Sequence, residues 1–135
     1  MTAKLDEVSF SDIKNMEREV KKIVDNLKLD EFAFEIKLIL SEAIANAFEH
    51  GNKKDVTKPI YIRYMKDSVL LTLEVQDSGE GFKNTVIPNV IEDENLMSER
   101  GRGLYLINCF SDEVTFKGNT IIMKKRINGL TAPHA

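Results

Sequence analysis

The sequence is poor in cysteine, with Cys109 alone among its 135 residues. One cysteine cannot form an internal disulfide, so a reducing compartment is the simpler setting. The N-terminal stretch MTAKLDEVSF has no signal-like apolar core, and no apolar run reaches the roughly 18 residues that a membrane span needs. These absences predict a cytoplasmic protein without a membrane partner, in which Cys109 is a simple packing residue.

The sequence also lacks an excess of positive charge. It has 19 Lys and Arg against 22 Asp and Glu, a net charge of -3. Nothing in this balance favours direct binding to nucleic acid or to an anionic membrane. Apolar residues make up 42% and charged residues 30%, as in ordinary globular proteins. The length and the lack of repeats predict a single domain over residues 1–127, followed by a disordered tail at 128–135.

The order of predicted elements indicates the fold class. Apolar spacing predicts helices at about 13–27, 31–50 and 102–111, the first opened by a capping-box-like SFSD at Ser9–Asp12 and the second ended by Gly51. A short edge strand is expected at 3–9. Two hairpins are expected at 60–77, turning at Lys66–Asp67, and at 113–127, turning at Gly118–Asn119. Helices and strands are segregated, which predicts an α+β two-layer sandwich with helices on one face of a mostly antiparallel mixed sheet.

The predicted helix at 31–50 has an unusual polar stripe. Glu42 and Asn46 are four residues apart and therefore share one face, near Glu35 and Glu49. An ordinary solvated face would explain the stripe if the helix lay at the surface. Because most other positions of this helix are apolar, the stripe is also consistent with a helix that faces a cleft.

Two glycine-containing stretches could complete such a cleft. DSGEGF, at Asp77–Phe82, follows a buried-looking strand, and its glycines allow a ligand to approach the backbone closely. ERGRGL, at Glu99–Leu104, places glycines and two arginines before a helix N-terminus, which attracts phosphate. Alone, the first could be a plain turn, and the second lacks the full dinucleotide or P-loop pattern. The irregular segment between them, residues 78–101, is typical of a functional lid.

In combination, the three stretches resemble the ATPase superfamily shared by gyrase, the mismatch-repair MutL proteins, sensor histidine kinases and a heat-shock chaperone. EAIANAFEHG resembles its N box, DSGEGF its first glycine box and GRGLYLI its second. Within that superfamily the chain is most similar to the small stand-alone bacterial anti-sigma factors that are also serine/threonine protein kinases. The resemblance extends over about residues 10–127 and implies the Bergerat-type ATP-binding fold.

The resemblance assigns a role to residues in each box. Asn46 is expected to bind Mg²⁺, and Asp77 to accept a hydrogen bond from the adenine amino group. Guanine presents a carbonyl at that position, so Asp77 should disfavour GTP by roughly 1–3 kcal/mol or more. The remaining residues expected to bind ATP are Gly79 and Gly81 near the base and sugar, and Gly101, Arg102, Gly103 and Leu104 near the phosphates.

Two residues are expected to be catalytic. Glu42 would be the base that orients and deprotonates the attacking hydroxyl, contributing about 10²–10⁴ in rate. Arg100 would reach the γ-phosphate and stabilise the charge of the transition state. The resemblance implies a homodimer that uses ATP and Mg²⁺ to phosphorylate an anti-anti-sigma partner of the STAS type, and that sequesters a sigma factor.

Three alternatives remain open. A non-catalytic ATP-binding module would switch partners by lid closure alone. A detached ATPase domain of a sensor histidine kinase would need its phosphorylated histidine on another protein, because only about ten residues precede the first predicted helix. Direct nucleic-acid binding has only a short lysine-containing loop, residues 53–58, in its favour.

Overall fold

A computed structural model describes residues 5–79 and 99–127 of the chain. The strands are β1 (Asp6–Phe10), β2 (Ile60–Lys66), β3 (Leu70–Gln76), β4 (Glu113–Lys117) and β5 (Thr120–Arg126). The α-helices are α1 (Met16–Leu27), α2 (Ala33–Asn46) and α4 (Glu99–Phe110). Short 3₁₀ turns at Ile13–Asn15 (η1) and Asp30–Phe32 (η2) lead into α1 and α2, and a π-helical turn at Ala47–Gly51 (η3) follows α2.

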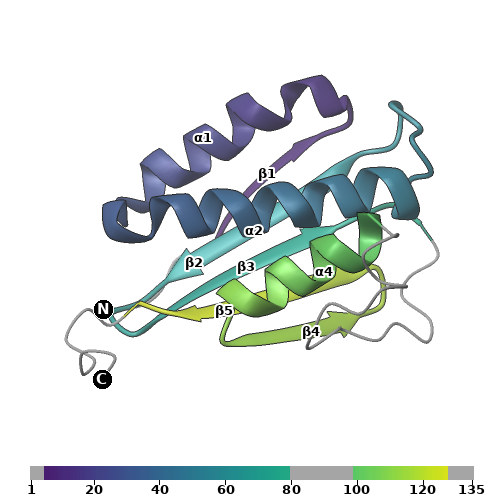
Figure 1. The fold of residues 1–135 in the computed structure, drawn as a ribbon. Helices are drawn as coiled ribbons and strands as arrows, with labels where there is room; N and C mark the ends of the chain where they lie inside the picture. The colour runs from purple at the N-terminus through teal and green to yellow at the C-terminus, as the bar shows by residue number, and fades with distance from the viewer. Residues whose placement is uncertain (1–4, 80–98, 128–135) are drawn as a thin grey trace.

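The strands form one sheet in the order β1-β2-β3-β5-β4, with β3 at its centre. The three α-helices of the described residues lie on the same side of this sheet, with α2 between α1 and α4 (Figure 1). The predicted α+β two-layer sandwich is therefore confirmed. Every strand pairing in the described residues is antiparallel, so no parallel pair of a mixed sheet occurs among them.

The core lies between the sheet and the helices. Alternate residues of the central strands point toward the helices and are buried, because successive side chains of a strand face opposite sides. They include Ile60, Ile62 and Tyr64 of β2, Leu71, Leu73 and Val75 of β3, and Ile121 and Met123 of β5. Helix α1 contributes one apolar stripe of Val20, Ile23 and Leu27, as its spacing predicts.

Helix α2 has apolar residues on several faces because it packs against the sheet, α1 and α4. Ile36, Ile39, Leu40 and Ile44 are fully buried. A helix with neighbours on three sides has only one narrow strip left for polar residues, which explains the pattern of its sequence.

Several boundaries differ from the sequence predictions. Ser9 lies in β1, and Asp12 alone provides the cap, accepting a hydrogen bond from the Lys14 N–H at 3.0 Å. The β2–β3 turn is longer than a Lys66–Asp67 turn: the Asp67 side chain accepts from the N–H groups of Val69 and Leu70 at 2.7 and 2.8 Å. The turn at Gly118–Asn119 is confirmed, with Gly118 at φ 61°.

The prediction that Cys109 packs in the core is wrong, because its side chain is exposed on α4. The buried positions of α4 are Gly103, Leu104 and Ile107, which follow the helical spacing of the face toward α2 and the sheet. Cys109 falls outside that spacing. Of the helices in the described ranges, none is long and apolar enough to cross a bilayer.

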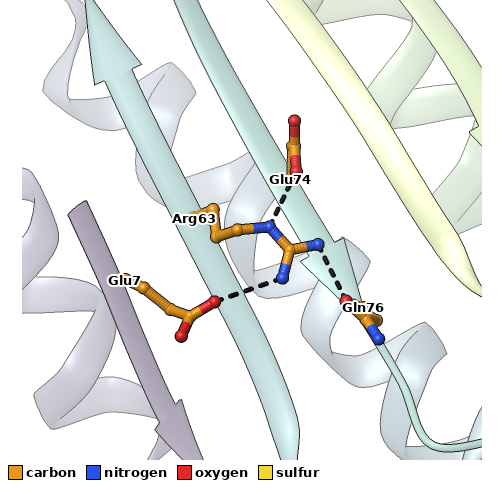
Figure 2. Close-up of polar contacts among 4 residues, drawn as sticks. All are labelled: Glu7, Arg63, Glu74 and Gln76. Carbon is orange, nitrogen blue, oxygen red and sulfur yellow. Dashed lines mark hydrogen bonds and ion pairs between the residues drawn. The ribbon is translucent and has the colours of Figure 1, made fainter. Parts of the chain in front are cut away.

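Arg63 joins three strands on the face of the sheet that points away from the helices (Figure 2). Its guanidinium donates to Glu74 of β3 at 2.8 Å, to Gln76 of β3 at 2.8 Å and to Glu7 of β1 at 3.2 Å. The planar fork of arginine suits this three-way contact. Arg63 thereby ties the edge strand β1 to the centre of the sheet.

Lys125 joins three elements on the helical side. It is 8% exposed, pairs with Glu35 in the first turn of α2 at 2.6 Å, and donates to the carbonyl of Phe110 at 3.0 Å. Its ammonium also lies 5.5 Å from the ring centre of Phe32. This contact connects β5, the start of α2 and the end of α4.

Candidate nucleotide site

A cavity of about 290 Å³ lies between the end of α2 and the start of α4. One wall comes from α2 and the π-helical turn, and the opposite wall from the first turns of α4. The lining residues are Glu42, Ala45, Asn46, Glu49, His50, Arg102, Gly103 and Leu106. Glu42, Asn46 and Glu49 of the polar stripe therefore face a cleft, whereas Glu35 pairs with Lys125 instead.

Glu42 stands on the α2 wall of this cavity. Partial burial raises the pKa of its carboxyl above the ordinary value, the nearby Glu49 raises it further, and Arg102 across the cavity lowers it. Burial and a like charge both disfavour the ionised form, whereas a cation favours it. A carboxylate whose pKa lies nearer neutrality is a stronger base, and such shifts are typical of functional sites.

Asn46 lies one turn after Glu42 on the same wall. Its Oδ1 atom is buried and has no hydrogen-bond partner among the described residues. A buried amide oxygen of this kind is unfavourable unless a ligand satisfies it. Because amide oxygens are hard ligands, Asn46 fits a Mg²⁺ ion.

The side chains near Asn46 suit a metal ion that takes most of its ligands from water and substrate and few from the protein. Within residues 5–79 and 99–127 there is no group of three or more His, Cys, Asp or Glu side chains that could hold a metal. Mg²⁺ in phosphate-transfer sites usually takes few protein ligands and completes its shell with water and substrate phosphates. The residues present therefore fit Mg²⁺ bound together with a polyphosphate.

The opposite wall is the glycine-containing start of α4. A Cβ atom on Gly103 would lie 2.8 Å from Oε1 of Glu42, so only glycine lets the two helices approach this closely without moving the carboxylate. Arg102 is exposed and lines the cavity, and the side chain of Leu104 is buried in the core. Gly101 lies in the first turn of α4, and the N-terminal end of a helix favours ligands that carry negative charge. Arg100 lies in the first turn of α4, and its side chain is outside the described part of the structure.

The π-helical turn Ala47–Gly51 follows α2 and brings Gly51 next to Asp77, which lies at the end of β3. Gly51 lies directly against the Asp77 carboxyl, and a Cβ atom on Gly51 would overlap it. The glycine is required by this close approach and not by a left-handed cap, because Gly118 is the only described glycine with positive φ. π-Turns within helices are rare and frequently occur at functional sites.

Asp77 lies at the end of β3 and is 4% exposed. Its Oδ1 accepts the N–H of Gly79 at 2.7 Å, and a Cβ atom on Gly79 would overlap the carbonyl oxygen of Gly51. Asp77 and Gly79 do not line the cavity of Glu42; they lie beyond Gly51, at the far side of the π-helical turn. Gly81 lies outside the described residues.

Sequence reasoning missed two asparagines beside Asp77. Asn52 is fully buried, and its Oδ1 accepts the N–H of Ser78 at 2.7 Å. Asn119, predicted only as a turn residue, donates from its side chain to the carbonyl of Asp77 at 2.6 Å. In the sequence, only the position of Asn52 directly after Gly51 pointed to a role for it. For Asn119 the sequence indicated a turn residue and nothing more.

Residues 10–125 match the model of the histidine kinase-like ATPase domain. The serine-protein kinase RsbW of Bacillus subtilis is 32% identical over 111 residues, covering 74% of this chain and 68% of that protein. The RsbW of Listeria monocytogenes is 32% identical over 103 residues, covering 70% and 66%. The anti-sigma F factor of Geobacillus thermodenitrificans is 30% identical over 100 residues, covering 69% and 68%.

Proposed function

Because this chain belongs to the histidine kinase-like ATPase domain family, and within it to the group of stand-alone serine-protein kinases and anti-sigma factors, we propose that it is an ATP-dependent serine/threonine protein kinase. One observation carries the proposal. Glu42 and Asn46 stand one turn apart on one wall of a cavity, and the glycine-containing start of α4, with Arg102, forms the other. The proposed base, the proposed metal ligand and the proposed phosphate-binding helix end would therefore lie around one cavity.

The nucleotide would lie along the three boxes. Asp77, buried at the end of β3, accepts a hydrogen bond from the adenine amino group, with Gly79 and Gly81 beside the base and sugar. The phosphates lie at the start of α4, beside Gly101 and Gly103, where the helix N-terminus favours negative charge and Arg100 and Arg102 add positive charge. The side chain of Leu104 is buried in the core, so Leu104 would contribute by holding this end of α4 in place.

Asn46 would hold Mg²⁺ through the buried Oδ1 atom that has no partner in the described structure. When bound, the ion neutralises negative charge on the phosphates during transfer. The Asn46 side chain would be a metal ligand held in a fixed position, because α2 packs against α1, α4 and the sheet.

Glu42 would act as the catalytic base. It accepts the proton of a serine or threonine hydroxyl on the partner, and that oxygen forms a bond to the γ-phosphorus of ATP. The bond from the γ-phosphorus to the oxygen that bridges it to the β-phosphate breaks, and ADP leaves with the electron pair. Arg100 and Arg102 stabilise the charge that develops on the transferred group. The raised pKa of Glu42 suits the role of proton acceptor.

The proposed partners follow from the relatives. One group of relatives is named serine-protein kinase and another anti-sigma F factor. We therefore assign to this chain an anti-anti-sigma protein of the STAS type as phosphate acceptor and a sigma factor as the sequestered partner. A homodimer, implied by the same resemblance, is tested by sedimentation equilibrium.

The kinase proposal is tested by incubating the protein with γ-labelled ATP, Mg²⁺ and a candidate anti-anti-sigma protein. We expect acid-stable label on the partner, and Glu42→Gln should lower the rate of transfer by about 10²–10⁴ while ATP still binds. Glu17→Gln, on the exposed surface of α1, is the matched control and should transfer at the wild-type rate.

Other outcomes would distinguish the alternatives. ATP binding without any label transfer would show a non-catalytic module. Acid-labile label on the partner would indicate phosphohistidine and the histidine kinase alternative. A Glu42→Gln variant as active as wild type would remove the proposed base.

A further inference from the structure

Asp77 is held by main-chain contacts that are separate from its proposed contact with the base. The Asp77 N–H donates to the carbonyl of Asn119 at 3.0 Å, and the Asn119 side chain donates back to the Asp77 carbonyl at 2.6 Å. Asn119 belongs to the two-residue turn between β4 and β5, 42 positions away in the chain. A single turn residue thus satisfies both backbone groups of Asp77, one from its own main chain and one from its side chain.

Asn52 holds the next peptide from the opposite direction. Its Oδ1 accepts the Ser78 N–H at 2.7 Å, while its Nδ2 donates to the carbonyls of Lys58 at 3.0 Å and Pro59 at 3.3 Å. The side chain is fully buried, and an amide whose donors and acceptor are all engaged cannot rotate without losing them. Asn52 therefore fixes the turn that follows Asp77 to the loop that follows α2.

The residue before Asp77 is held as well. Gln76 accepts a hydrogen bond from Arg63 at 2.8 Å on the outer face of the sheet (Figure 2). The segment from Gln76 to Ser78 is thus held at three consecutive residues: at Gln76 through its side chain, and at Asp77 and Ser78 through main-chain groups. The partners lie on β2, the β4–β5 turn and the loop after α2. Gly51 leaves no room for the Asp77 carboxyl to move toward α2.

We propose that Asn119 and Asn52 are positioning residues that fix Asp77 for the recognition of adenine. This inference rests on the proposed binding of ATP and deepens it. A hydrogen bond to one amino group selects a base only if the acceptor is held in place, because the energy falls steeply with distance and angle. Asn119 and Asn52 would therefore determine base selectivity without touching the nucleotide.

The test compares two nucleotides that differ only at the position Asp77 would read. Dissociation constants are measured for ATP and for purine riboside triphosphate, which lacks the 6-amino group. In the wild type we expect the analogue to bind at least about tenfold more weakly, because Asp77 loses its donor. In Asn119→Ala this ratio should fall by about threefold or more, because a less firmly held carboxylate gains less from the amino group.

Asn119→Asp separates the hydrogen bond from the volume of the side chain. It has the same shape but no N–H donor, so it should lower the ratio as Asn119→Ala does. Asn52→Ala should lower the ratio too. Asn26→Ala, an exposed asparagine on α1, is the matched control and should keep the wild-type ratio. Partial unfolding of a variant weakens both nucleotides by the same factor, so the ratio remains informative.

Each outcome decides the proposal. Equal weakening of both nucleotides in the Asn119 and Asn52 variants would show a purely structural role and overturn it, as would a wild-type ratio in Asn119→Asp. If the wild-type protein bound ATP and the analogue equally well, Asp77 would not recognise the amino group, and the proposal would fail although ATP binds. Failure of the wild-type protein to bind either nucleotide would instead refute the proposed function itself, and the inference with it.

Discussion

Gly103 on α4 lies so close to Glu42 on α2 that a Cβ atom added to it would be 2.8 Å from Oε1 of Glu42. The two residues come from different boxes, 61 positions apart, and this approach closes one side of the cavity. Because the atom in the way is the far end of a flexible side chain, the carboxylate can shift to make room. A larger residue at position 103 should therefore displace the Glu42 carboxylate more than it destabilises the fold.

We expect Gly103→Ala to separate stability from activity. Alanine is favoured over glycine inside a helix by about 1 kcal/mol, which should offset the displaced carboxylate and leave Tm nearly unchanged. Phosphate transfer should fall by about tenfold or more, because the base is moved from its position. Thermal unfolding and initial rates of label transfer give the two numbers. Wild-type transfer by Gly103→Ala would contradict the role of Glu42 placed here.

The raised pKa of Glu42 predicts how activity depends on pH. A general base must be ionised, so kcat should rise with pH through the raised pKa of Glu42. Glu49→Gln removes a charge that raises this pKa, so the rise should move to lower pH. Arg102→Ala removes a charge that lowers it, so the rise should move to higher pH. Rates at saturating ATP across pH 4–8 (about the range where carboxyl groups in sites titrate) check both directions. Shifts of the same sign in the two variants would exclude this account.

The raised pKa of Glu42 also predicts that stability falls as pH rises, whereas activity rises. The folded pKa of Glu42 lies above its unfolded value, so the unfolded state loses its proton first, and stability falls as pH rises between the two values. Glu42→Gln should therefore raise Tm at neutral pH and leave it unchanged below the unfolded pKa. Unfolding curves at both pH values test this. An equal change of Tm at both would point to packing instead of charge.

Asn46→Ala should strengthen the fold and weaken metal-dependent binding. It removes a buried amide oxygen that lacks a partner in the described structure, and alanine suits a helix better. The free energy of unfolding should rise by about 1 kcal/mol or stay equal. Wild-type affinity for ATP should drop when Mg²⁺ is removed with a chelator, whereas the affinity of Asn46→Ala should respond little. Unaltered Mg²⁺ dependence in the variant would remove Asn46 from the metal site.

The ion pair between Lys125 and Glu35 predicts a stability effect far from the nucleotide. Lys125→Ala leaves Glu35, with its side chain 32% exposed, and the Phe110 carbonyl without their partner, and should cost about 2–4 kcal/mol. Lys125→Met combined with Glu35→Gln keeps the volume without a lone charge and should recover most of that loss. Denaturant unfolding measures both. Equal losses in the two variants would show that the lost ion pair and the lost hydrogen bond to Phe110 cause the destabilisation, and not a lone charge or lost volume.

The sequence was sufficient for the fold class and for the order of elements. Period-two burial in β2 and β3 and the segregation of helices from strands are local signals, and the structure confirms both. The N box was also recognisable, because Glu42 and Asn46 share a helix face whatever surrounds the helix. The joint lining of one cavity by Glu42, Asn46, Arg102 and Gly103 depends on how α4 packs on α2, which no local pattern states.

Other features could not be predicted because they depend on contacts between distant segments. The hydrogen bonds of Asn119 and Asn52 to the Asp77 turn join positions 42 and 26 residues apart, and asparagine is ordinary in any turn. Gly51 was expected to end a helix, yet its role is to let Asp77 approach, which depends on β3. Cys109 was placed in the core by the apolar character of its helix, without regard to which face is covered.

The π-helical turn at Ala47–Gly51 determines which way Gly51 and Asn52 face relative to α2. The Asn52 N–H donates to the carbonyl of Ala47, five residues back, at 2.8 Å, so this turn holds one residue more than an α-helical turn. Each residue in an α-helix advances by about 100°, so the extra residue rotates the chain beyond it by that angle. Glu42 and Asn46 can thus face α4 while Gly51 and Asn52 face Asp77. Deleting one residue from the turn would leave the first pair in place and turn the second away from Asp77.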